Sequence, residues 1–172
     1  MSSIREDGKV QFSFAKPPRV ALVVSRFNTG VTGGLRAGAR AWLAEHGIIH
    51  QDEDLFDSPG AFELPLIAQT LARTDRYDGV ICLGCVIKGD TAHFEFISLG
   101  TATGLMQASL ATGVPISFGV LTTYTEEQAV VRSRDDAHNK GREAAAACIE
   151  CLDTLQTIRK LAEGTGAAII GF

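Results

Sequence analysis

Short apolar segments alternate with longer stretches of helical periodicity along the chain, and this alternation restricts the fold more than any other feature. Strands are predicted at residues 20–25, 53–57, 79–87 and 115–121. Helices are predicted at residues 32–46, 61–72, 92–112, 126–132 and 139–161. Because parallel strands need crossover connections, the pattern predicts an α/β domain with a four-stranded parallel sheet covered by helices on both faces. In such folds, ligands bind beyond the carboxyl ends of the strands.

Composition narrows the class of protein. The 172 residues suit one domain, and a hydrophobic fraction of 45% excludes extended disorder. No apolar stretch approaches the roughly 20 residues of a membrane span, and the first residues lack the apolar core of a secretory signal. A cytoplasmic location is therefore expected. A net charge of −4 does not indicate a nucleic-acid surface, and the many small apolar residues leave open that some are buried between copies of the chain.

The domain is expected to span residues 19–161, with an N-terminal segment at 1–18 and a C-terminal tail at 162–172. Lys9–Phe14 alternates polar and apolar residues, which fits an additional edge strand on this subunit or on a neighbour. The tail from Gly164 to Phe172 is apolar and rich in glycine, and either packs on another surface or frays.

Two C-x-x-C pairs raise the question of a zinc or redox site. Cys82 and Cys85 lie on a predicted strand, where a separation of three points their side chains to opposite faces. Cys148 and Cys151 lie among alanines on a predicted helix, where cysteine is commonly a small core residue. A metal or disulfide role is therefore disfavoured for both pairs.

The first two strands are followed by an aromatic residue and a carboxylate. Phe27 taken alone is interpreted as a cap on the core, whereas its ring could also offer a face to a planar heterocycle. Glu63 falls in a first helical turn, where the helix dipole stabilises a carboxylate without any function, or where it accepts hydrogen bonds from ligand hydroxyls. Gly60 beside it would let a ligand approach the backbone closely.

The third and fourth strands are followed by groups suited to an anion. Gly89–Thr91 precede a helix, so that their backbone N–H groups form a plausible phosphate seat, and His93 beside them can take and give a proton near neutral pH. Cationic residues cluster downstream, at Arg132, Arg134, His138 and Lys140. They form either an ordinary solvated connection or a phosphate clamp. Together the strand ends predict a pocket for a planar, polyol-bearing molecule and a phosphorylated one.

Five motifs, in this order, resemble the lumazine synthases of riboflavin biosynthesis: Arg26–Asn28, Pro59–Pro65, Gly84–Phe94, Phe118–Thr123 and Asn139–Gly141. The resemblance implies a flavodoxin-like three-layer α-β-α sandwich. It also implies condensation of 5-amino-6-(D-ribitylamino)uracil with 3,4-dihydroxy-2-butanone 4-phosphate, the penultimate step of the pathway, without metal or organic cofactor.

The resemblance assigns these residues to the ribitylaminouracil: Phe27, Ala61, Phe62, Glu63, Cys85, Val86, Ile87 and Phe118. Phe27 would stack on the pyrimidine, Phe118 would close the pocket over the heterocycle, and residues 61–63 would hold the ribityl chain. The backbone of residues 85–87 would line the edge of the pyrimidine.

The resemblance assigns the butanone phosphate to a second group of residues. Asp90 and Thr91 would seat the phosphate, Arg132 would pair with it, and Lys140 would assist. His93 would shuttle protons during the reaction.

The resemblance further implies a site between adjacent subunits of a homopentamer, with Phe118 and Arg132 donated by the neighbour. Twelve pentamers form a 60-subunit icosahedral shell in some members, and the sequence leaves pentamer and shell open. One alternative is a non-catalytic flavin-binding, lumazine-binding or shell-forming protein on the same scaffold. A generic flavodoxin-like nucleotide-binding domain is disfavoured, because Ser25–Thr32 is not a glycine-rich phosphate cradle.

Overall fold

The computed structural model describes residues 12, 14, 16–48 and 50–164. Within them, the strands are β1 (Val20–Ser25), β2 (Leu55–Ser58), β3 (Gly79–Ile87) and β4 (Ile116–Thr123). The helices are α1 (Thr29–Glu45), α2 (Leu64–Ala72), α3 (His93–Thr112), α4 (Glu126–Arg132) and α5 (Lys140–Gly164), and the short 3-10 helix η1 (Asp52–Asp54) precedes β2.

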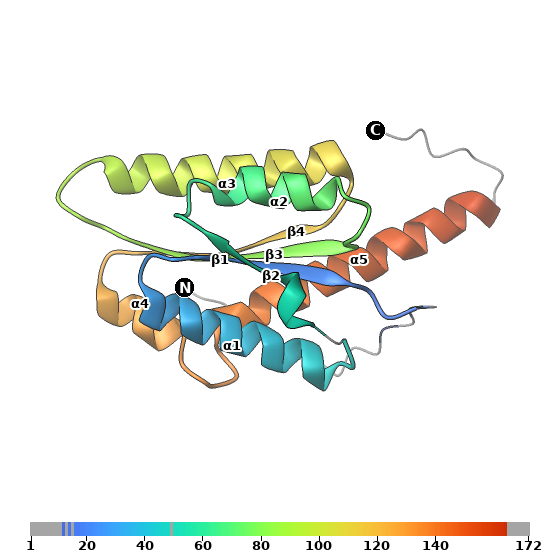
Figure 1. The fold of residues 1–172 in the computed structure, drawn as a ribbon, viewed down its shortest axis with the longest axis horizontal. Helices are drawn as coiled ribbons and strands as arrows, with labels where there is room; N and C mark the ends of the chain where they lie inside the picture. Colours follow the sequence, from blue (N-terminus) through green and yellow to red (C-terminus); the bar gives the residue numbers. More distant parts are fainter. Residues whose placement is uncertain (1–11, 13, 15, 49, 165–172) are drawn as a thin grey trace.

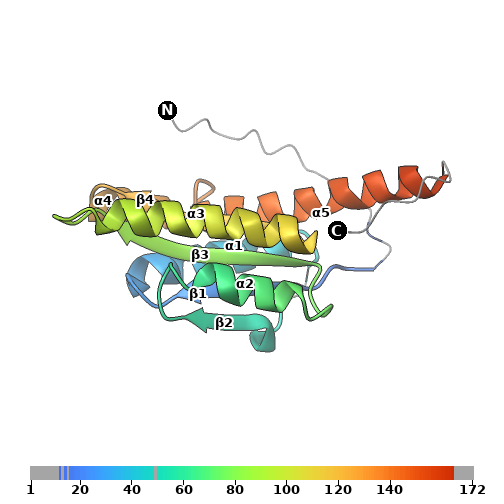
Figure 2. The same cartoon turned by 90° about the horizontal axis from the view of Figure 1, so that it is seen from above.

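The strands form one parallel sheet in the order β2-β1-β3-β4 (Figure 2). Helices α2 and α3 cover one face, and α1, α4 and α5 cover the other (Figure 1). The predicted three-layer α/β fold is thus confirmed. The order places β2 and β4 at the two edges, so that β4 keeps one edge without a strand partner among the described residues.

Alternation along the strands divides the core into two clusters, one on each face of the sheet. Leu22 packs with α1 and α5, whereas its neighbours Ala21 and Val23 pack with α2. Cys82 and Cys85 likewise fall into opposite clusters, as their separation on the strand predicts. Burial raises the pKa of the Cys85 thiol to about 11, so this thiol is neutral at physiological pH.

Several element boundaries differ from the sequence-based expectation, and the differences at β2 and α2 have local reasons. β2 begins at Leu55 because the preceding residues form η1, whose ends are closed by a reciprocal capping box between Gln51 and Asp54. α2 begins at Leu64, so that Pro65 falls in its first turn, where the missing N–H has no helical partner to lose.

The strand expected at Lys9–Phe14 and the tail from Gly164 lie outside the described residues, except for Phe12, Phe14 and Gly164 itself. Phe12 and Phe14 pack against the α1 side of the core. Across the described residues, none of the helices combines the length and apolar character needed to cross a bilayer.

Candidate functional site

Beyond the carboxyl ends of β1, β2 and β3 lies a cavity of about 480 Å³, here called the Phe27 pocket. It is lined by Phe27, Asn28, Gly60, Ala61, Phe62, Glu63, Cys85, Val86, Ile87, His93 and Ile97. The pocket contains every residue predicted to hold the ribitylaminouracil except Phe118, together with the predicted catalytic histidine.

One wall of the Phe27 pocket is the end of β3, which extends further than its neighbour. β1 pairs with β3 only as far as Val24 and Leu83, whereas β3 pairs with β4 as far as Ile87. Beyond the end of β1, the Asn28 side chain replaces the missing strand partner of β3. Its Nδ2 donates to the carbonyl of Cys85 over 3.0 Å. Backbone groups alternate in direction along a strand, so those of Ile87 share this edge and face the pocket.

The backbone conformation of Asn28 places its side chain for this hydrogen bond. It occupies the left-handed region at φ 54° and ψ 54°, which asparagine tolerates better than most residues. Its carbonyl accepts the first hydrogen bonds of α1, from the N–H groups of Val31 and Thr32. Phe27 beside it leaves 66% of its surface exposed toward the pocket opening. Sequence analysis placed Asn28 in a motif but gave it no role.

The second wall is the turn between β2 and α2. Ser58 donates to the carbonyl of Gly60 over 2.7 Å, and the buried Thr101 hydroxyl of α3 donates to the carbonyl of Ala61 over 3.1 Å. A Cβ atom at Gly60 would lie 2.9 Å from Glu63 Oε2 and 3.6 Å from the Phe27 ring. The absence of a side chain at Gly60 therefore lets the Glu63 carboxylate and the Phe27 ring lie close together.

The loop from Lys88 to Ala92 joins β3 to α3 and carries the predicted phosphate seat. Lys88 is fixed by Glu95, whose carboxylate lies 2.8 Å from Nζ and raises the pKa of the lysine. Its ammonium also lies over the rings of Phe94 and Tyr124, at 5.9 and 5.5 Å from their centroids. Thr91 Oγ1 accepts from the N–H of His93 over 3.4 Å.

Asp90 and Thr91 are exposed on this loop and line neither pocket described here. They precede Ala92, the N-cap residue of α3, and so lie close to the N-terminus of this 20-residue helix. Free N–H groups and the helix dipole make such an end favourable for an anion.

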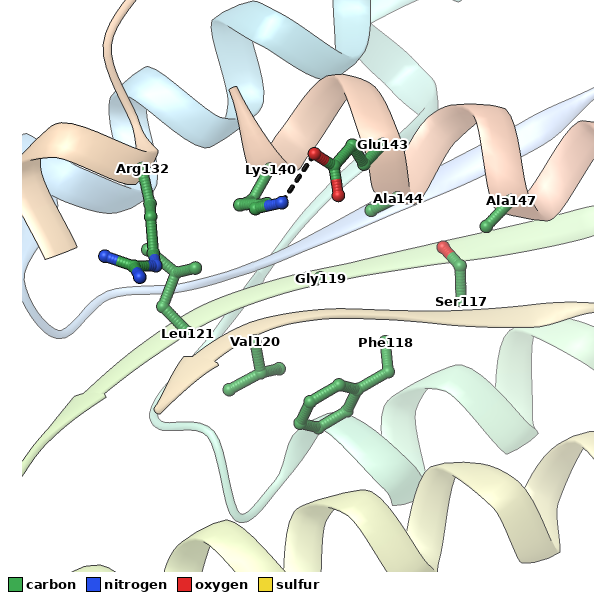
Figure 3. A pocket seen from close by; sticks show the side chains of 10 residues that line it. All are labelled: Ser117, Phe118, Gly119, Val120, Leu121, Arg132, Lys140, Glu143, Ala144 and Ala147. Atoms are coloured by element: carbon green, nitrogen blue, oxygen red, sulfur yellow. Dashed lines mark hydrogen bonds and ion pairs between the residues drawn. The ribbon is translucent and has the colours of Figure 1, made fainter. Parts of the chain in front are cut away.

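A second cavity, of about 370 Å³, lies between β4 and α5 and is here called the Arg132 pocket (Figure 3). It is lined by Ser117, Phe118, Gly119, Val120, Leu121, Arg132, Lys140, Glu143, Ala144 and Ala147. Phe118 points to the opposite side of β4 from Lys140 and Glu143 (Figure 3). The unpaired edge of β4 thus presents an aromatic ring on one side and cations on the other.

The charged groups of the Arg132 pocket are held by short local contacts. Lys140 Nζ lies 2.5 Å from Glu143 Oε1, one helical turn further along α5. Arg132 Nη1 donates to the carbonyl of Gln128 over 2.9 Å, at the end of α4. Glu143 had not been predicted, although its i, i+3 spacing from Lys140 was a visible signal.

Apart from Asp90 and Thr91, the predicted site residues are therefore divided between two pockets that share no lining residue. The Phe27 pocket offers an aromatic face, a carboxylate and an imidazole, which suit a planar polar molecule with hydroxyl groups. The Arg132 pocket offers a guanidinium and an ammonium group, which suit an anion. Within one chain, Phe118 and Arg132 line a different cavity from Phe27 and His93.

The sequence profile of the 6,7-dimethyl-8-ribityllumazine synthase family matches residues 17–156. The chain is 66% identical to 6,7-dimethyl-8-ribityllumazine synthase 1 of Caulobacter vibrioides over 144 residues, which cover 84% of this chain and 94% of that protein. It is 47% identical to the 6,7-dimethyl-8-ribityllumazine synthase of Lactiplantibacillus plantarum over 142 residues, which cover 83% of this chain and 89% of that protein. The 6,7-dimethyl-8-ribityllumazine synthase of Deinococcus radiodurans is also 47% identical, over 83% of this chain and 92% of its own length. The chain belongs to the 6,7-dimethyl-8-ribityllumazine synthase family.

Proposed function

We propose that this protein condenses 5-amino-6-(D-ribitylamino)uracil with 3,4-dihydroxy-2-butanone 4-phosphate to give 6,7-dimethyl-8-ribityllumazine. One phosphate and two waters leave, and these products balance the atoms without an oxidant or reductant. The observation that carries the proposal is the Phe27 pocket, which combines an exposed aromatic face, a carboxylate and an imidazole in a member of this family.

The Phe27 pocket is proposed to bind the ribitylaminouracil. The Phe27 ring stacks on the pyrimidine, and the backbone N–H and C=O of Ile87 pair with the amide groups along the pyrimidine's edge. Glu63, in the turn of residues 61–63, accepts hydrogen bonds from ribityl hydroxyls. Asn28 supports this arrangement because it fixes the neighbouring Cys85 carbonyl and so the end of β3.

The butanone phosphate is proposed to bind between the β3–α3 loop and the Arg132 pocket of a second copy. Asp90 and Thr91 contribute the helix N-terminus, with the Thr91 hydroxyl and backbone N–H groups directed at the phosphate oxygens. Arg132 pairs with the phosphate charge, and Lys140 adds a second cation held by Glu143. Phe118 of the second copy covers the heterocycle from its open side.

Assembly into a ring of copies is supported by an apolar seam along α3. Phe96, Leu99, Met106 and Leu110 expose between 65% and 72% of their surface. Their successive spacings of three, seven and four residues place them on one face, as in the heptad pattern of helices that pack against other helices. Side chains of this kind are rarely left in water, and a ring would also bring one copy's β4 edge to the next copy's Phe27 pocket. We propose the homopentamer of the family resemblance, alone or within a 60-subunit shell.

In the proposed mechanism, the 5-amino group attacks the ketone of the butanone phosphate, and loss of water leaves an imine. Removal of a proton beside the imine expels the phosphate, whose departing charge Arg132 stabilises. The elimination leaves an enol, which tautomerises to a ketone at the carbon that carried the hydroxyl group. The ribitylamino nitrogen then attacks this new carbonyl, and loss of the second water closes the ring. His93 takes and returns the protons, a role typically worth about 10²–10⁴-fold in rate.

The test is to mix the purified protein with both substrates and to follow the lumazine chromophore together with released phosphate. Equal amounts of both products, formed faster than in the uncatalysed mixture, are expected. Binding of the ribitylaminouracil without acceleration would overturn the enzymatic proposal in favour of a binding protein. Sedimentation of the same sample distinguishes a pentamer from a shell.

A further inference from the structure

Asn139 directly precedes Lys140 of the Arg132 pocket, where the segment after α4 meets the start of α5. Its side chain is 1% exposed and donates from Nδ2 toward three backbone carbonyls. These belong to Gly34 of α1 at 3.1 Å, Ser133 at 3.0 Å and Arg134 at 2.8 Å. One amide group therefore ties the residues directly after Arg132 to α1.

The other half of the same side chain begins α5. Asn139 Oδ1 accepts from the N–H of Gly141 over 2.8 Å and from the N–H of Arg142 over 3.3 Å. These groups lie in the first turn of α5, where N–H groups have no helical partner, and asparagine is a preferred cap there. Because Lys140 directly follows Asn139, the cap also fixes the position of the Lys140 backbone, from which its side chain projects.

Three glycines make room for this arrangement. A Cβ atom at Gly38 would lie 2.2 Å from Asn139 Oδ1, and one at Gly34 would lie 2.3 Å from the Ser133 carbonyl oxygen. At Gly141 a Cβ atom would lie 1.9 Å from the Leu35 carbonyl oxygen. Glycine inside a helix costs about 1 kcal/mol relative to alanine. Gly34 and Gly38 of α1 are therefore explained by the close approach of the segment that carries Asn139.

We propose that Asn139 is a positioning residue for phosphate binding, holding Arg132 and Lys140 at the separation that the phosphate requires. Arg132 lies one residue before an anchored carbonyl, and Lys140 lies one residue after the cap. The two cations come from different helices, α4 and α5, and the Asn139 side chain bonds to the backbone at both junctions. The inference rests on the proposed function, because it takes Arg132 and Lys140 as phosphate ligands.

Two substitutions disturb the anchor from different sides. Asn139→Asp keeps the oxygen that caps α5 but replaces the amide donor with an acceptor facing three carbonyls. Gly38→Ala leaves Asn139 unchanged but places a methyl group against its Oδ1. Gly33→Ala is the matched control, because a Cβ atom at this position of α1 meets nothing within 4 Å.

The probe is inorganic phosphate, a product and therefore an inhibitor, measured on assembled protein together with the KM of each substrate. Asn139→Asp and Gly38→Ala are each expected to raise the phosphate Ki and the KM of the butanone phosphate about fivefold to tenfold. The KM of the ribitylaminouracil is expected to change less than twofold. Gly33→Ala is expected to change none of these constants.

Combination with Arg132→Ala separates positioning from a merely structural role. If Asn139 acts through Arg132, Asn139→Asp changes the phosphate Ki less than twofold in the Arg132→Ala background. An equal factor in both backgrounds, or an unchanged Ki in assembled Asn139→Asp and Gly38→Ala proteins, would overturn the inference. If Asn139→Asp does not assemble, Gly38→Ala decides alone. An unchanged Ki in Arg132→Ala itself would instead overturn the proposed phosphate site.

Discussion

The Phe27 pocket and the Arg132 pocket are built in different ways. The Phe27 pocket lies where several strand ends meet, and hydrogen bonds such as Asn28 to Cys85 and Thr101 to Ala61 shape its walls. The Arg132 pocket lies on the edge strand β4, and its functional groups are a guanidinium and an ion pair. The first is suited to recognise a neutral planar molecule, and the second to supply charge. Neither pocket alone therefore offers all the groups that the proposed reaction needs.

The substitutions with the largest expected effects test whether the Phe27 pocket and the Arg132 pocket of one active site come from different chains. His93→Ala is expected to lower kcat by at least 100-fold because it removes proton transfer. Arg132→Ala is expected to raise the KM of the butanone phosphate about 10- to 100-fold, since a charge-assisted hydrogen bond is worth about 1.5–3 kcal/mol.

The decisive measurement is the activity of mixed assemblies made by co-expressing these two variants in equal amounts. In a ring in which every site uses two neighbours, about a quarter of the sites combine an intact His93 with an intact Arg132. With the butanone phosphate well below its KM, activity of about a quarter of the unsubstituted protein is therefore expected. Mixed assemblies no more active than either variant alone would mean that each site lies within one chain.

An intermediate effect is expected from Thr101, which belongs only to the Phe27 side. Thr101→Val removes the hydroxyl that donates to the Ala61 carbonyl and leaves a buried acceptor without that donor. The KM of the ribitylaminouracil is expected to rise about threefold to tenfold, as for the loss of one hydrogen bond, while the phosphate Ki stays within twofold.

Thr101→Ser is the matched control, because it keeps the hydroxyl and is expected to stay within about twofold of the unsubstituted protein. A larger change in the phosphate Ki than in the uracil KM would show that the two pockets are not independent.

The smallest expected effect concerns Cys85 in the wall of the Phe27 pocket. Burial raises its pKa to about 11, so below that pH the thiol is protonated and at pH 8 only about one molecule in a thousand carries the thiolate. Iodoacetamide at pH 8 is therefore expected to leave Cys85 unmodified, as measured by mass spectrometry of its peptide. Modification is expected to increase as the pH approaches 11. Rapid modification at pH 7 would contradict a neutral, apolar wall.

The order of the strands and helices could be predicted because it depends on local periodicity. Among the boundaries that were wrong, those of β2 and α2 depend on capping by Gln51 and Asp54 and on a turn whose Ala61 carbonyl accepts a hydrogen bond from α3. Phe27, Glu63 and His93 could be named because they follow strand ends, which share one side of a parallel sheet. Residues such as Cys85 and Phe118 lie within strands and were named from the family resemblance.

The supporting residues could not be assigned roles from the sequence, because each acts through a partner far along the chain. Asn28 bonds to a residue 57 positions away, Thr101 to one 40 away and Asn139 to one 105 away. The cluster of glycines in α1 was a visible signal for a close approach, but what approaches could not be deduced from it.

The sequence by itself determined the fold class, the family resemblance and the candidate site residues, since periodicity and short motifs are local properties. Only the tertiary structure decided how those residues are grouped. It gave β4 an edge position, with Phe118 and Arg132 apart from Phe27 and His93. The physical reason is that strand order and helix packing depend on contacts between distant segments. The same kind of contact explains why α1 has glycine at positions 34 and 38, where the segment that carries Asn139 packs against it.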